Sequence, residues 1–135
     1  MKREIKFRAL KDDMSNCTFV YGQLVYDAID IPRITEKCGD GLKFNTCIKG
    51  TEGQFTGLKD SKGVEIYEGD ILKRKCKLPE YEGQIFNNAV YYLHGRFRIK
   101  NGRYTSDLTK NNIYNGEMEV IGNIHENPEL LQNNL

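Results

Sequence analysis

Cysteine and histidine are the residues of this sequence whose side chains most readily bind a metal ion. A structural zinc site takes closely spaced ligand pairs, such as two cysteines separated by two to four residues. No two of the candidate residues are that close in the sequence. We therefore expect no metal, no cofactor, and small thiols that are buried or half-buried. The candidates are Cys17, Cys38, Cys47, Cys76, His94 and His125.

Covalent catalysis requires a nucleophile beside a base that a third group orients. His94 precedes Gly95 in an expected turn, and His125 lies next to Glu126, but neither belongs to a motif such as G-x-S-x-G. Paired carboxylates could exist among Asp60, Glu65, Glu68 and Asp70, but hydrogen bonds to nearby turn amides explain Asp60 and Asp70. The sequence thus predicts no enzyme. A cysteine–histidine pair assembled in space, or a small-ligand pocket around His125, remains an alternative.

Clustered basic residues are the best candidates for a binding surface. Arg96, Arg98 and Lys100 alternate along one expected strand, so they project from one face about 7 Å apart. Tyrosines nearby could stack on bases, a combination that small barrels use to bind nucleic acid. A net charge of +1 provides no overall attraction. The candidate nucleic-acid-binding residues are Lys73, Arg74, Lys75, Lys77, Arg96, Arg98, Lys100 and Arg103, with Tyr91, Tyr92 and Tyr104 beside them.

Short strands joined by tight turns must position these residues. The run Asp60-Ser61-Lys62-Gly63 is typical of a type I turn with a glycine bulge, and Asn101-Gly102 of a two-residue hairpin. Pro128 to Gln132 predicts a short helix capped by Asn127. In the segment 27–50 we expect a short strand at 29–31, a long loop, and a strand from Phe44 to Ile48. Together, these turn and strand signals predict an all-β chain that forms a barrel or a sandwich.

Two stretches of the sequence resemble a known family. Residues 54–72 read QFTGLKDSKGVEIYEGDIL and residues 120–131 read VIGNIHENPELL. Both resemble the YopX family of phage and prophage proteins, and residues 3–8 and 20–22 are similar to its opening strands. The resemblance implies an SH3-type barrel in the C-terminal half and a phage-derived accessory protein acting inside the host cell. It carries over no catalytic or ligand residue.

The 135 residues, 39% of them apolar, suffice for one sizeable core. We expect a mostly β protein with a β-rich lobe over 1–53, which includes the long loop, and an SH3-like barrel with a short C-terminal helix over 54–135, packed as one unit. The sequence shows no secretory signal or membrane-spanning run, which favours the cytoplasm and reduced thiols.

The leading functional hypothesis is a non-enzymatic module that binds a host or phage protein, or a copy of itself as a homo-oligomer. It would use exposed strand edges or the 27–50 loop. The alternative is nucleic-acid binding through the basic strand faces.

Overall fold

The computed structural model describes residues 3–14, 18–76, 79–102 and 104–132. Within these ranges the chain is mostly β, with eleven strands, one short α-helix and two 3-10 helices. It divides into two compact units, Met1–Phe55 and Thr56–Leu135. The division falls inside β5 (Gly53–Lys59). None of the helices in the described ranges is long and apolar enough to cross a membrane.

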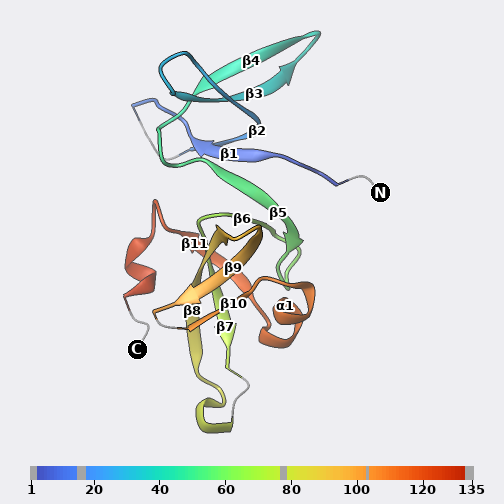
Figure 1. Ribbon diagram of the computed structural model, residues 1–135, viewed down its shortest axis with the longest axis vertical. Coiled ribbons are helices and arrows are strands. Elements are labelled where there is room, and N and C mark those ends of the chain that lie inside the picture. The colour runs from blue at the N-terminus through green and yellow to red at the C-terminus, as the bar shows by residue number, and fades with distance from the viewer. Residues whose placement is uncertain (1–2, 15–17, 77–78, 103, 133–135) are drawn as a thin grey trace. The chain divides into compact units, whose positions relative to one another are not determined.

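Unit 1, residues 1–55, is an antiparallel sheet in the order β4-β3-β2-β1, with the start of β5 beside β1 (Figure 1). Its four complete strands are β1 (Phe7–Leu10), β2 (Phe19–Tyr26), β3 (Pro32–Cys38) and β4 (Gly41–Thr46). The first half of β2 pairs with β1 and the second half with β3, and the change of partner occurs at Gly22. Only glycine fits there, because a Cβ at Gly22 would lie 2.0 Å from the Thr35 carbonyl oxygen.

The prediction of a long loop within residues 27–50 is wrong, because β3 and β4 form a hairpin. The strand predicted from Phe44 to Ile48 is confirmed in part, as the C-terminal half of β4. A turn replaces the short strand expected at 29–31, since the Asp27 carboxylate accepts hydrogen bonds from the Ile29 and Ile31 amides at 3.0 Å each. Gly39, with φ of 58°, turns the chain between β3 and β4. The burial alternates as a strand requires, with Pro32 and Ile34 inside, but charged residues on the outer positions concealed this pattern.

The core of unit 1 contains Ala9, Val20, Ile34 and Cys47. The chain after β4 closes onto the chain after β1 through the bridge between Lys11 and Cys47. Backbone hydrogen bonds flank this bridge: the Ile48 amide donates to Leu10, and the Asp12 amide donates to Thr46, both at 2.9 Å. The C-terminal end of β4 thereby pairs with a second segment of the chain, besides β3.

Unit 2, residues 56–135, contains a five-stranded antiparallel sheet in the order β10-β9-β8-β7-β11 (Figure 1). The Asp60–Gly63 turn forms as predicted and joins the end of β5 to β6, since the Gly63 amide donates to the Asp60 carbonyl at 3.0 Å. The strands of this unit after β5 are β6 (Glu65–Tyr67), β7 (Asp70–Lys75), β8 (Ile85–Leu93), β9 (Arg96–Asn101), β10 (Tyr104–Asp107) and β11 (Glu119–Asn123).

Helical segments lie against both faces of this sheet. The α-helix α1 (Lys110–Gly116), which we did not predict, contributes Ile113 to the core formed with Leu72, Val90 and Ile99. Its first turn is capped by Thr109, whose hydroxyl accepts from the Asn112 amide at 3.1 Å. A further short segment, η1 (Pro79–Tyr81), precedes β8.

The predicted C-terminal helix is present as the 3-10 turn η2 (Pro128–Leu131). We had expected the Asn127 side chain to cap this helix, but it does not. Instead its Oδ1 accepts from the Asn123 amide at 3.2 Å. The carbonyl of Leu130 accepts from the side chain of Asn87 on β8 at 2.8 Å, which holds η2 on the sheet face opposite α1.

Candidate functional site

The predicted basic residues lie mainly on one face of the unit 2 sheet. Residues opposite each other in an antiparallel sheet share a face, and Tyr91 on β8 lies opposite Arg98 on β9. By the same register, Arg96, Lys100, Lys73 and Lys75 project to this side, so we call these five cations and Tyr91 the basic face. The alternation predicted for β9 is therefore present.

One predicted residue among those described does not join the basic face. Arg74 points to the opposite side, where its guanidinium donates to the Ser106 hydroxyl at 3.3 Å and its stem packs over Gly116. Lys77 and Arg103 lie outside the described residues. Of the six predicted cations that the structure describes, five therefore lie on the basic face.

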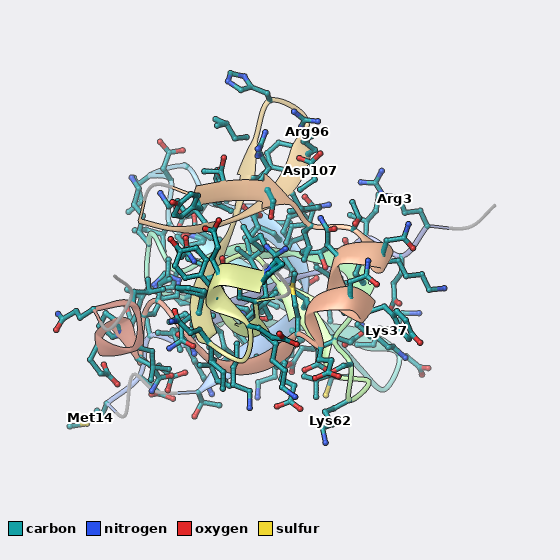
Figure 2. All side chains as sticks on the ribbon, turned by 90° about the horizontal axis from the view of Figure 1, so that it is seen from below. Arg3, Met14, Lys37, Lys62, Arg96 and Asp107 are labelled. Atoms are coloured by element: carbon teal, nitrogen blue, oxygen red, sulfur yellow. The ribbon has the colours of Figure 1, made fainter. Side chains whose placement is uncertain are left out.

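Carboxylates neutralise much of the basic face. Lys73 lies 3.3 Å from Glu119, and Lys75 lies 2.7 Å from Glu117, whose hydrogen bond and charge raise the pKa of the Lys75 ammonium. On β9, Arg96 and Arg98 lie 3.2 and 3.7 Å from Asp107, and Figure 2 shows Arg96 and Asp107 side by side. These acids come from β10 and from the segment around the start of β11.

Lys100 makes a different contact. Its Nζ lies 5.1 Å from the centre of the Tyr91 ring, a cation–π geometry that keeps the charge on the surface. The neighbouring Arg98 donates to the Thr105 hydroxyl at 3.3 Å. Lys100, Tyr91 and Arg98 therefore form the part of the basic face that best suits a stacked base beside a phosphate.

The thiols and imidazoles do not converge on a reactive centre in the part of the chain that is described. Cys47, just after β4, is buried, and burial raises the pKa of its thiol, whereas Cys38 is exposed at the end of β3. His94 lies exposed in the β8–β9 turn, and the His125 ring packs near Gly69. No group of three cysteine, histidine or acidic side chains among the described residues could hold a metal ion. Cys17 lies outside the described residues.

The carboxylate of Asp60 is a structural acceptor. It is buried, with one oxygen accepting from the Lys62 and Val64 amides at 2.8 and 2.9 Å. The other oxygen accepts from the Val120 amide on β11 at 2.8 Å. Asp70, also buried, accepts from the Tyr67 amide at 2.7 Å. Both acids therefore satisfy turn amides, as the sequence indicated.

The sequence analysis did not predict that the first half of β4 has one edge without a neighbouring strand. β4 is one of the two terminal strands of its sheet, with β3 as its neighbour. The Cys47 amide donates to the Pro32 carbonyl, so in the alternating pattern of an antiparallel pair Asn45 and Lys43 also bond to β3. The backbone groups of Leu42 and Phe44 then face away from β3.

The outward groups of Leu42 and Phe44 make no hydrogen bond within the described part of the chain. Their side chains are 58% and 54% exposed and share one face of the hairpin. Thr46, the next outward residue, is already bonded to Asp12. The open edge of β4, meaning Gly41 to Phe44, therefore combines free amides and carbonyls with two exposed apolar side chains. A weak alternation within a polar segment was the only signal for it in the sequence.

Comparison with known proteins identifies the family. The family model described as "YopX protein" matches residues 6–132. The chain belongs to the YopX family. The crystal structure of protein EF1440 from Enterococcus faecalis is similar, with 28% sequence identity, a TM-score of 0.62, and coverage of 96% of this chain and 99% of that chain. No curated protein matches the sequence.

The two stretches that resemble the YopX family meet in unit 2. Besides the bond from Val120 to Asp60, the Ile124 amide donates to the Gly69 carbonyl at 2.8 Å. Gly122 has no room for a side chain, since a Cβ would lie 2.5 Å from Asn127 Oδ1. In this chain the two stretches are therefore joined by backbone pairing and close packing.

We predict that replacing Asp60 with alanine destabilises unit 2. The Lys62, Val64 and Val120 amides would lose a charged acceptor, which costs about 3 kcal/mol or more in the free energy of unfolding. Asp60→Asn keeps one oxygen and should cost less. Urea unfolding followed by far-UV circular dichroism measures both, with the exposed Glu82→Ala as the control, expected within about 0.5 kcal/mol of the unchanged protein. Equal stability of Asp60→Ala and Glu82→Ala would contradict this role.

Proposed function

We propose that this YopX family protein is a non-enzymatic, phage-derived accessory module that binds a protein partner inside the host cell. Partner binding would occur by strand addition, in which an extended segment joins a sheet edge and forms main-chain hydrogen bonds. The observation that carries the proposal is the open edge of β4, with the outward backbone of Leu42 and Phe44. We also propose that residues 54–135 form an SH3-like barrel.

The two edge strands of the unit 2 sheet, β11 and β10, are less suited to strand addition than β4. On β11 the Val120 amide bonds to Asp60 and the neighbouring Met118 carbonyl accepts from Ser61, and the strand carries a bulge at Ile121. Bulges and covering turns are means by which natural proteins block an edge. β10 is only four residues long. The edge of β4 has one charged residue, Lys43, and two exposed apolar side chains, which suits pairing with an extended segment.

Proline at position 44 should abolish partner binding while leaving unit 1 folded. It removes the outward amide of Phe44 but none of the hydrogen bonds between β4 and β3. The measurement is affinity capture with the full chain from cells that carry its gene, with and without nuclease. We expect partners retained by the unchanged protein to be lost with Phe44→Pro and kept with Tyr114→Ala, a control that removes an aromatic ring 82% exposed in unit 2. Partners retained equally by Phe44→Pro would contradict the proposal.

Nucleic-acid binding is the second candidate, and the placement of Lys100, Tyr91 and Arg98 on one face favours it. Three carboxylates beside the basic face, Asp107, Glu117 and Glu119, reduce its attraction for phosphates. Loss of captured partners on nuclease treatment would point to this candidate.

If the basic face binds nucleic acid, affinity for oligonucleotides should fall by more than about tenfold between roughly 50 and 200 mM salt, because bound phosphates release counterions. Lys100→Ala, Arg96→Ala and Lys75→Ala should each weaken binding, whereas the exposed Lys59→Ala should not. Fluorescence anisotropy with single- and double-stranded oligonucleotides measures this. Absence of binding to both at low salt would eliminate the candidate.

A further inference from the structure

The open edge of β4 is complementary to a second copy of itself. Leu42 and Phe44 are two positions apart, and both direct their amide and carbonyl outward. In an antiparallel arrangement around a twofold axis at Lys43, Leu42 of each copy lies opposite Phe44 of the other. All four outward groups of each copy then find partners, which gives four hydrogen bonds across the edge.

From this we propose that two copies of the chain pair through their β4 strands with Lys43 at the twofold axis. This inference rests on the proposed function, and it identifies the added strand as β4 of a second copy. Other registers fit less well. Pairing Phe44 with its own copy would place Leu42 opposite Thr46, whose carbonyl already bonds to Asp12.

Side chains on both faces of the hairpin suit the same register. On one face, the exposed side chains of Leu42 and Phe44 would cover each other across the axis. On the other, Lys43 lies directly opposite Glu36 on β3 within each copy. The row across the dimer would read Glu36, Lys43, Lys43, Glu36, so each ammonium has a carboxylate on its other side. This arrangement offsets the repulsion between the two lysines at the axis.

Cysteine substitution tests the register directly. Residues at a pair without hydrogen bonds lie about 4.5 Å apart at Cα, close enough for a disulfide. In a full chain with serine at positions 17, 38 and 76, Lys43→Cys should oxidise to a disulfide-linked dimer on a non-reducing gel. Lys62→Cys, whose parent side chain is 71% exposed, is the matched control and should stay monomeric. A mixture of Leu42→Cys and Phe44→Cys chains should cross-link to each other and not to themselves.

Light scattering of the unchanged protein supplies the second measurement. We expect the apparent mass to rise with concentration toward that of a dimer, and Phe44→Pro, which loses one hydrogen bond donor per copy, to weaken dimerisation by about tenfold or more. A concentration-independent monomer together with no excess cross-linking of Lys43→Cys over Lys62→Cys would overturn the inference. If Phe44→Pro still lost its captured partners in that case, strand addition would stand with a different occupant. If capture were also unchanged, both proposals would fall.

Discussion

Pairing of backbone amides and carbonyls is the constraint on which this structure depends. Short strands and tight turns leave many such groups without neighbours along the chain, and burial without a partner is costly. In unit 2 the carboxylate of Asp60 accepts from three amides, and the Asn123 side chain accepts from those of His125 and Glu126 at 3.0 Å each. Gly69 donates to Val90 and accepts from Ile124. Polar side chains and glycines thus complete a pairing that the strands alone leave unfinished.

The same constraint explains the contacts made by the two stretches that resemble the YopX family. Asp60 and Gly69 stand in turns, and Gly122 and Asn123 end strand β11. As polar residues and glycines, all four resemble functional residues in a sequence. In the structure each contacts the backbone or a closely packed neighbour. Their chemical requirements are satisfied within unit 2. A binding surface is therefore better sought where backbone pairing remains incomplete, and β4 provides such a place in unit 1.

Local features of the structure were predictable from the sequence where the deciding interactions are close along the chain. The turn at Asp60 to Gly63 and the one-sided arrangement of Arg96, Arg98 and Lys100 both follow from residues a few positions apart. Features that depend on distant residues were not predictable. Asp107 and Glu119 neutralise the basic face, but only strand pairing brings them there.

Strand β3 and the first half of β4 were missed for a related reason. The outward positions of β3 carry charged residues such as Arg33 and Lys37. The alternation of apolar and polar residues around the buried Ile34 was therefore too short to indicate a strand. The helix α1 was missed because Asn115 and Gly116 are typical of a turn, although the core contact of Ile113 stabilises a helix there. In both cases tertiary contacts outweighed local preference.

Hydrogen–deuterium exchange of the β4 amides is the most direct test of the account, because it reports whether each donor is bonded. In dilute solution the Lys43 and Asn45 amides should exchange slowly, since they face β3, while those of Leu42 and Phe44 should exchange quickly. At high protein concentration, the Leu42 and Phe44 amides should become protected. Protection of these two amides at every dilution, or fast exchange at every concentration, would contradict an open edge that a second strand completes.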